Sequence, residues 1–183
     1  MQITLIRHLP TEWNKKAVLQ GRKNISISDI TTEHQARIMK NKLLLQENAP
    51  YDLVLASSLR RTQQTAKQYD FEPLVETLLD ELDFGIYEGN PRQKLLDHFG
   101  KQWMENPETI RLGESLLTLE ERIAAFLKKY LSYKNILLFG HGAWIRAFLS
   151  YVHNGNLSDM NKRKVRFNDP VIMNINNAKK ITY

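Results

Sequence analysis

Three short apolar runs stand out from an otherwise mixed pattern of hydrophobic and polar residues, and each is typical of a buried strand. They are ITLI (residues 3–6), DLVLA (52–56) and NILLF (135–139), each bounded by polar or turn-forming residues. Strands that are apolar on both faces indicate a mostly parallel sheet covered on both sides. The C-terminal stretch 166–183 predicts one last strand and a tail.

Helical spacing lies between these runs. Within residues 114–130 the apolar side chains recur on one helical face, at Leu116, Leu119, Ile123, Phe126, Leu127 and Tyr130. Residues 31–45 form a weaker amphipathic pattern, and Ser57 or Ser58 is expected to cap a helix that continues through Arg61 and Thr65. The alternation predicts an α/β fold, a three-layer α/β/α sandwich with a mostly parallel central sheet.

Composition limits the class of protein. The chain has 183 residues, of which 42% are hydrophobic and 25% charged, as in a soluble globular protein. No repeat or Gly/Ser linker divides it, so a single domain over residues 1–183 is predicted. No apolar run approaches the roughly 18 residues of a membrane span, and no secretory signal opens the chain, so a cytoplasmic location is expected. No feature of the sequence indicates an oligomeric state.

Charge and cysteine content exclude further classes. The formal net charge is +6, with basic clusters at Arg22-Lys23, Lys128-Lys129 and Lys162-Arg163-Lys164. Aromatic residues do not alternate with these clusters, so they are interpreted as a solvated surface and no nucleic-acid partner is predicted. The absence of cysteine excludes disulfides, thiolate metal sites and cysteine nucleophiles.

Candidate chemistry follows the strands directly. The residues after the three runs are Arg7-His8, then Ser57-Ser58-Leu59-Arg60-Arg61, and finally Gly140-His141-Gly142. Because ligands of open α/β sheets bind beyond the carboxyl ends of the strands, these residues are expected to meet at one edge. Paired guanidinium groups and a helix N-terminus predict an anion there, and phosphate is the anion that matches them best.

A histidine is the predicted nucleophile of this site. A neutral imidazole can attack phosphorus and form a phosphohistidine, which divides one difficult displacement into two easier ones. The sequence has no Gly-x-x-x-x-Gly-Lys-Ser/Thr loop, no Asp-x-Asp after a strand and no Cys-x5-Arg loop. No two histidines stand at i, i+4 spacing, so a metal site built from His8, His141 and carboxylates is disfavoured.

Six segments, in order along the chain, resemble the motifs of the histidine phosphatase superfamily, also called the phosphoglycerate-mutase-like family. RHLPTEWN resembles its Arg-His-Gly-x-Thr-x-x-Asn signature, and VLQGRKN its segment with a Gln-Gly pair. SSLRRTQQTA resembles the helix that carries its phosphate-binding arginine, and ELDFGIYEG the segment that carries its proton donor. GES (113–115) and FGHG (139–142) complete the set. The resemblance covers nearly the whole chain and implies a phosphoglycerate-mutase-like fold.

The resemblance also implies residue roles in a phosphomonoester hydrolase that uses neither metal nor cofactor. His8 would attack phosphorus, and Glu81 would protonate the leaving oxygen before water attacks the phosphohistidine. Arg7, Arg61 and His141 complete the implied catalytic set. The implied substrate-binding positions are Asn14, Thr11, Gln20, Gly21 and Gly142.

Three ambiguities accompany this alignment. Arg60 competes with Arg61 as the phosphate ligand, and Asp80, Asp83 or Glu88 could take the role of Glu81. Leu9 stands where the family usually has glycine; Pro10 favours an extended backbone at Leu9, so the leucine is expected only to narrow the pocket. Trp103, in KQWMENPE, is expected to pack in a helical insert over the site and to contribute to substrate choice.

The substrate is predicted only as a class. A small phosphorylated metabolite is expected, such as a sugar phosphate, a phosphorylated amino acid or α-ribazole phosphate, and a phosphoprotein would also suit the site. Arg22-Lys23, close to Gln20, suggests a second anionic group on the substrate. Two other functions stay open: a phosphoglycerate mutase, and a weakly catalytic protein that binds a phosphorylated ligand.

Overall fold

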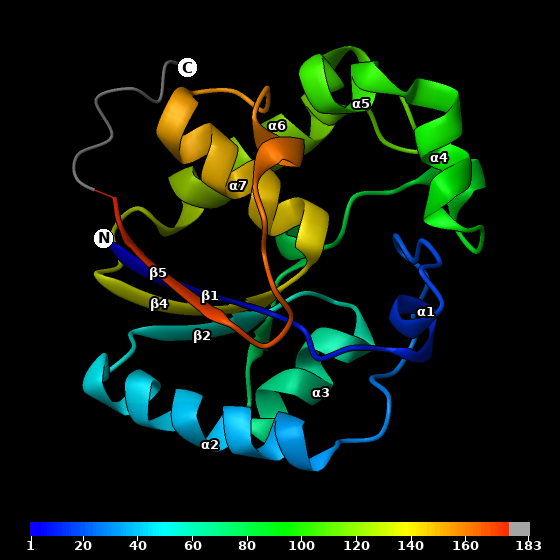
Figure 1. The fold of residues 1–183 in the computed structure, drawn as a ribbon. Helices are drawn as coiled ribbons and strands as arrows, with labels where there is room; N and C mark the ends of the chain where they lie inside the picture. Colours follow the sequence, from blue (N-terminus) through cyan, green and yellow to red (C-terminus); the bar gives the residue numbers. More distant parts are fainter. Residues whose placement is uncertain (176–183) are drawn as a thin grey trace.

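The computed structural model describes residues 1–175, and a five-stranded sheet in the order β3-β2-β4-β1-β5 lies at its centre (Figure 1). Neighbouring strands run parallel except β5, which is antiparallel to β1. The strands are β1 (Gln2–Arg7), β2 (Leu53–Ala56), β3 (Leu74–Val75), β4 (Asn135–Gly140) and β5 (Pro170–Asn174). All four predicted strands are confirmed; β3 is an additional edge strand. Residues 176–183, the predicted tail, lie outside the described residues.

Helices cover both faces of the sheet, which confirms the three-layer α/β/α prediction. In Figure 1, α2 (Thr32–Glu47) and α3 (Arg60–Gln68) lie below the sheet, and α6 (Leu116–Tyr130) and α7 (Gly142–Asn154) lie above it. In β4, Ile136 and Leu138 belong to the core under α6 and α7, whereas Leu137 and Phe139 belong to the core under α2. Since successive strand side chains point to opposite faces, this apolar run supplies both cores.

The start of α3 differs from the prediction. Its N-cap is Leu59, which makes no side-chain cap hydrogen bond, so neither Ser57 nor Ser58 caps it. The Ser58 hydroxyl instead donates to the carboxylate of Asp80, 2.8 Å away. The Ser57 hydroxyl accepts from the backbone N–H of Leu59 and lies 2.6 Å from the Nε2 of His141. Tertiary partners therefore take up both hydroxyls.

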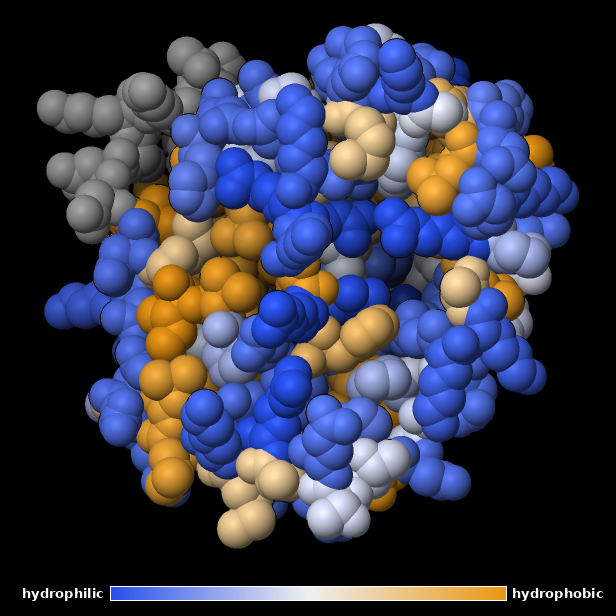
Figure 2. Space-filling model, in the orientation of Figure 1, coloured by the Kyte–Doolittle hydropathy of each residue, from blue (hydrophilic) through white to orange (hydrophobic). Residues whose placement is uncertain are grey.

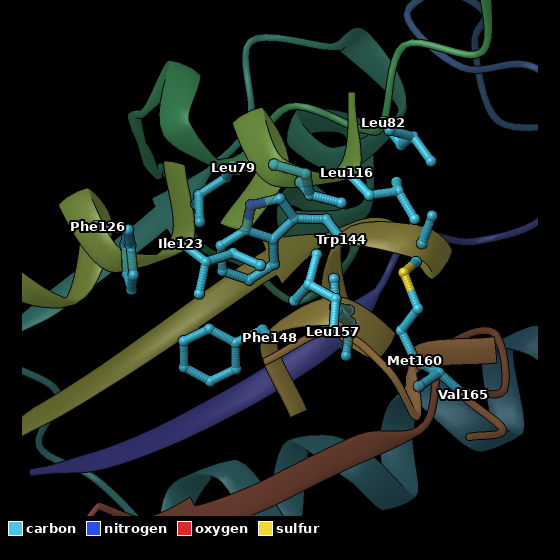
Figure 3. Packing of buried hydrophobic residues seen from close by; sticks show 14 of the residues in the cluster. Leu79, Leu82, Leu116, Ile123, Phe126, Trp144, Phe148, Leu157, Met160 and Val165 are labelled. Atoms are coloured by element: carbon cyan, nitrogen blue, oxygen red, sulfur yellow. The ribbon is translucent and has the colours of Figure 1, made fainter. Parts of the chain in front are cut away.

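The core between α6, α7 and the chain after α7 fixes the helix that begins beside His141. The rings of Trp144 and Phe148 are stacked 5.1 Å apart, and Phe126 of α6 meets Trp144 edge-on at 5.6 Å. Figure 3 shows Leu157, Met160 and Val165 packed against the same cluster. Because such interiors are close-packed, α7 and the segment after it hold one another in place.

Short elements cover the carboxyl edge of β1 and β4, at the right of Figure 1. The α-helices there are α1 (Glu12–Lys15), α4 (Arg92–Phe99) and α5 (Lys101–Glu105). Four single 3₁₀ turns complete the described chain: η1 (Thr77–Leu79), η2 (Gly85–Tyr87), η3 (Pro107–Thr109) and η4 (Met160–Lys162). Trp103 is buried in α5, as expected of a helical insert. Across residues 1–175, no helix has both the length and the apolar character needed to cross a membrane.

Candidate active site

Strand register brings the two predicted catalytic histidines together. Arg7 lies beside Gly140 in the parallel pair of β1 and β4, so His8 and His141 are the next residues of neighbouring strands. Their ring centroids are 5.4 Å apart. The backbone N–H of His8 donates to the carbonyl of Gly140 at 3.0 Å, which extends the sheet to the site itself. The carboxyl-edge rule therefore predicts this meeting correctly.

One ring nitrogen of His8 is hydrogen-bonded to the backbone, and the other keeps its lone pair. Its Nδ1 lies 2.7 Å from the carbonyl oxygen of Leu9. A carbonyl can only accept, so Nδ1 carries the proton and Nε2 keeps its lone pair. The Leu9 N–H in turn donates to the Thr65 hydroxyl of α3 at 2.9 Å, which ties this turn to the helix layer. The Nδ1 hydrogen bond thus orients the imidazole, and Thr65 holds the backbone of the residue that accepts it.

His141 is engaged at both ring nitrogens. The Nε group of Arg61 donates to His141 Nδ1 at 3.2 Å. The proton of a neutral ring then lies on Nε2, which donates to the Ser57 hydroxyl 2.6 Å away. Ser57 Oγ lies 2.9 Å from Thr62 Oγ1, and Thr62 Oγ1 donates to the carbonyl of Leu59. This chain of hydroxyls fixes the ring, and direct contact of His141 with a phosphoryl oxygen stays a prediction.

Burial and neighbouring arginines keep both histidines neutral. Desolvation, followed by the charges of Arg61 and Arg7, holds the pKa of His8 well below its usual value of 6.5. Desolvation and Arg61 likewise lower the pKa of His141 well below 6.5. A neutral His8 is the form that can attack phosphorus, because protonation would remove its lone pair.

Arg61, not Arg60, lines the pocket. Arg61 is 1% exposed, whereas Arg60 is exposed on the outer side of the same turn. The terminal nitrogens of Arg61 donate to the carbonyls of Lys23 at 2.7 Å and Gly21 at 2.8 Å. Burial lowers the pKa of Arg61 to about 10, which leaves it charged at neutral pH.

Arg7 lines the same pocket as Arg61. Its Nη1 donates to the carbonyl of Val165 at 2.9 Å, and its guanidinium carbon lies 3.5 Å above the ring of Phe167. Its Nε is buried without a hydrogen-bond partner. A Cβ on Gly142 would lie 3.0–3.1 Å from this guanidinium, so glycine at 142 leaves room for Arg7. Burial, then the charge of Arg146, lowers the pKa of Arg7 to about 10.

The Gln20-Gly21 turn is held by a carboxylate of the ELDFGIYEG segment. Gly21 has a φ of +50°, and a Cβ there would fall 1.9 Å from Glu88 Oε1. That oxygen accepts from the backbone N–H groups of Arg22 and Phe84. Gln20 is 6% exposed, and its Oε1 is buried without a partner. Gly21 is therefore needed for both conformation and space, and the turn directs Gln20 and a carbonyl toward the site.

Glu81 is the carboxylate that reaches the pocket. Its Oε1 accepts from the N–H groups of Leu82 at 3.0 Å and Trp144 at 2.9 Å, and its Oε2 accepts from Ala143 at 3.1 Å. Two of these donors belong to the first turn of α7, where orphan N–H groups favour an anion. The competing acids Asp80, Asp83 and Glu88 bond to Ser58, Gly85 and the Gly21 turn, and none of them lines the pocket.

Thr11 and Asn14 form the capping box of α1. The Thr11 hydroxyl accepts from the Asn14 N–H, and the Asn14 side chain accepts from the Thr11 N–H. Asn14 also lines the pocket, whereas Thr11 does not. Thr11 is thus placed to orient Asn14, and its predicted contact with substrate stays a prediction.

The pocket has a volume of about 310 Å³. In Figure 2, a hollow with mainly hydrophilic walls opens between the region that contains α1 and the region that contains α4 and α5. Predicted site residues that line it are Arg7, His8, Asn14, Gln20, Gly21, Arg61, Glu81 and Gly142. Lining residues outside the six motif segments include Arg92, Leu95, Arg146 and Phe167. Helical spacing could have indicated Arg146, because it lies one turn after Gly142.

Leu9 does not have the effect expected from the sequence. It is absent from the residues with positive φ, so the backbone there is unstrained. Its side chain is 1% exposed and packs with Ile6, Ala66 and Phe139 in the core under α2. Leu9 does not line the pocket. The prediction that it narrows the pocket is wrong, because the side chain points into the core.

Arg22 and Lys23 also lie outside the pocket lining. Arg22 forms an ion pair with Glu114 at 3.3 Å and donates to the carbonyl of Glu81. The sequence-based suggestion that this pair binds a second anionic group is therefore not supported. Within residues 1–175, no three or more His, Asp or Glu side chains come together as a possible metal site.

Comparisons with known proteins agree with this geometry. A family model described as the histidine phosphatase superfamily (branch 1) matches residues 3–179. The protein of Bacillus subtilis named uncharacterized phosphatase PhoE is 29% identical over 161 residues, 84% of this chain and 78% of that protein. The 2,3-bisphosphoglycerate-dependent phosphoglycerate mutase of Bartonella tribocorum is 26% identical over 193 residues, 95% of this chain and 92% of that protein. The structure of the alpha-ribazole phosphatase of Shigella flexneri has a TM-score of 0.76 at 24% identity, covering 98% and 92% of the two chains.

Proposed function

The chain belongs to the histidine phosphatase superfamily and is a phosphatase of that type, and we propose that it hydrolyses a small phosphomonoester through a phosphohistidine at His8. The proposal includes independence from metal ions. Its substrate class is a small phosphorylated metabolite, because a pocket of about 310 Å³ is at the lower end of the range for small-molecule sites.

One observation carries the proposal: His8 is neutral, oriented, and open to the pocket at one nitrogen. Its Nδ1–H is bound to the Leu9 carbonyl, its pKa is held low by burial and arginines, and its ring lines the cavity. An imidazole fixed in this tautomer presents the Nε2 lone pair as the nucleophile.

The positions of the arginines support a phosphoryl group in front of His8. Arg7 and Arg61 line the same cavity, and both are charged at neutral pH. The unpartnered Nε of Arg7 is a donor available to a phosphoryl oxygen, and Asn14 lines the cavity beside it. Hydrogen-bond donors that are already in place would stabilise the negative charge on the phosphoryl oxygens during transfer.

The proposed reaction has two displacements. In the first, His8 Nε2 forms a bond to phosphorus while the ester P–O bond breaks, and Glu81 gives a proton to the leaving oxygen. In the second, Glu81 takes a proton from water, the water oxygen bonds to phosphorus, and the P–N bond breaks to release inorganic phosphate. Glu81 is restored, so atoms and protons balance over one turnover.

The test compares the wild-type protein with His8→Ala and with His153→Ala, an exposed histidine on α7 that serves as the matched control. Phosphate release from 4-nitrophenyl phosphate is measured in excess EDTA. We expect release by the wild type and the control and none by His8→Ala, together with an acid-labile phosphoenzyme in the wild type. Release by His8→Ala, or release that requires added metal, would contradict the proposal.

Transfer to a second hydroxyl is the remaining reaction to separate from hydrolysis, because one relative is named a phosphoglycerate mutase. The wild type is incubated with 3-phosphoglycerate and a trace of 2,3-bisphosphoglycerate. Hydrolysis yields inorganic phosphate and glycerate, whereas a mutase yields 2-phosphoglycerate without phosphate release. We expect the first result.

A further inference from the structure

Beyond the phosphoryl site, the same pocket holds two more arginines that the proposed reaction does not use. Arg146 belongs to α7 and Arg92 is the first residue of α4, and both line the cavity. Arg92 is exposed and therefore lies at the mouth, whereas Arg146 is half-buried in the wall. The pocket thus has a second basic centre, contributed by two elements that are distant in sequence.

Arg146 is held in position by neutral groups. It lies one helical turn after Gly142, on the face of α7 that meets the Arg7 guanidinium. Its Nη2 donates to Asn161 Oδ1 at 3.3 Å, and the Asn161 amide donates to the carbonyl of Trp103 at 2.8 Å. An amide bridge to α5 therefore orients this guanidinium without neutralising it.

Arg92 is anchored through its backbone. Its N–H donates to the carbonyl of Ala17 at 2.8 Å, and Pro91 forms an isolated bridge with Val18. Ala17 and Val18 also line the cavity, so this anchor places the start of α4 at the mouth. The side chain of Arg92 makes no hydrogen bond or ion pair within residues 1–175.

Neither arginine has a carboxylate at ion-pair distance in the described part of the chain, which contrasts with two arginines outside the pocket. Arg122 and Arg22 both bind Glu114, at 2.6 Å and 3.3 Å. Arg146 lies close enough to Arg7 for their charges to repel, and this repulsion contributes to the lowered pKa of Arg7. Gathering like charges in a partly buried cavity is unfavourable unless an anion offsets them.

The net positive charge of the side chains that line the cavity exceeds the negative charge of one phosphate group. Four guanidinium groups line it, from Arg7, Arg61, Arg92 and Arg146, against one carboxylate, that of Glu81. Both histidines are neutral, and a phosphomonoester carries about two negative charges at neutral pH. A bound phosphoryl group would therefore leave positive charge at Arg92 and Arg146.

We infer that Arg146 and Arg92 form a subsite for a second anionic group of the substrate, either a carboxylate or a second phosphate. The inference rests on the proposed function for the phosphoryl end of that substrate. Phe84, Leu95 and Trp103 give the cavity apolar lining, which suits a short carbon spacer between the two anionic ends. Guanidinium groups suit either anion, because their paired N–H donors match two oxygens.

The experiment measures binding of phosphonates, whose carbon–phosphorus bond replaces the ester oxygen. Propylphosphonate has one anionic end, 3-phosphonopropionate has an added carboxylate and propane-1,3-diphosphonate an added phosphonate. Dissociation constants are measured by calorimetry with the wild type, Arg146→Gln, Arg92→Gln and the control Lys94→Gln, an exposed residue of α4 outside the cavity lining. Thermal melts verify that each variant is folded.

We expect the wild type and Lys94→Gln to bind one of the two-ended phosphonates more tightly than propylphosphonate. This preference should fall by roughly tenfold to a hundredfold in Arg146→Gln, the range for a charge-assisted hydrogen bond, and by less in exposed Arg92→Gln. The ligand that shows the preference identifies the anion as carboxylate or phosphate.

Equal binding of all three ligands by the wild type would overturn the inference, and so would a preference that survives in both arginine variants. Phosphonate binding requires no turnover, so these outcomes are independent of the phosphatase assay. A protein that releases phosphate but shows no preference would refute only the second subsite. A protein that binds no phosphonate would contradict the phosphoryl site as well.

Discussion

The pocket is built from two unlike regions, a floor at the carboxyl ends of the strands and an outer wall carried by α4, α5 and α7. On the floor, His8 and Arg61 are at most 2% exposed, and each is held by hydrogen bonds to backbone carbonyls. In the outer wall, Arg92 is exposed and Arg146 has one amide contact.

This difference separates two tasks of the proposed enzyme. Displacement at phosphorus requires groups held within a fraction of an ångström, and the residues proposed for it include strand-end residues and Arg61 of α3, which the sheet and the helix layer immobilise. Recognition of the rest of a substrate needs charge and shape but less precision. The four predictions below test whether the floor and the wall differ in this way, beginning with the largest effect.

Glu81→Gln should lower kcat for an alkyl phosphate by about 10²–10⁴, because a poor leaving group needs the proton that Glu81 is proposed to supply. The loss with 4-nitrophenyl phosphate should be much smaller, since 4-nitrophenolate leaves without a proton. The measurement is kcat for both esters, with Glu105→Gln on α5 as an exposed control from the wall. Equal losses of kcat for the two esters would contradict the role of Glu81 as general acid.

Gly21→Ala should destabilise the protein by about 3 kcal/mol, from positive φ and from displacement of Glu88. The kcat/KM value should fall too, because the Gly21 carbonyl holds Arg61. Gly155→Ala is the matched control: Gly155 has a φ of +77°, and a Cβ added there would have no atom within 4 Å, so only about 1 kcal/mol is expected. Denaturant unfolding measures both, and equal losses would show that contact with Glu88 is unimportant.

The free energy of unfolding should decrease as the pH falls below 6.5. His8 and His141 have a pKa well below 6.5 in the folded protein, so the unfolded chain binds their protons first. Between pH 6.5 and the lowered pKa, each histidine reduces the free energy of unfolding by up to about 1.4 kcal/mol for each unit by which the pH falls. The stabilisation from keeping the histidine neutral is fully present only above pH 6.5. Denaturant unfolding between pH 7.5 and 5.5 should show a shallower dependence in His8→Gln, and an unchanged slope would count against burial of a neutral His8.

Phe167→Leu should weaken inhibition by inorganic phosphate by about two- to fivefold, because it removes the ring on which the Arg7 guanidinium stacks at 3.5 Å. Phe167→Tyr retains the ring and is the matched control. The inhibition constant against 4-nitrophenyl phosphate is the measurement. The same constant in both variants would mean that the ring of Phe167 does not help to position Arg7.

Much of the floor can be predicted without the structure. The apolar runs of β1, β2 and β4 identify the central strands, and parallel strands place Arg7-His8, Arg61 and Gly140-His141 at one edge. The choice of Arg61 over Arg60 and of Glu81 over its acidic neighbours cannot be made this way. That choice depends on which side chain of a loop or helix turn faces the cavity. The buried positions of the folded protein show this, and the order of adjacent residues does not.

The errors have a common cause in long-range contacts. Leu9 lies in the same short turn as His8, yet it enters the core under α2 because that core has space for it. Ser57 and Ser58 have good capping side chains, but His141 and Asp80 bind them. Local propensity is outweighed wherever a tertiary partner satisfies the same polar atom.

The amino-acid order determined the strands, their layer arrangement and the motif residues of the proposed phosphoryl site, because apolar runs, helical spacing and short motifs are local features of a sequence. Only the tertiary structure decided that Arg92, Arg146 and Phe167 come together in one pocket. They come from three separate segments without a shared motif, and their meeting depends on how α4, α7 and the chain before β5 pack against one another. Packing of distant segments is a property of the whole core, which no short stretch of sequence encodes.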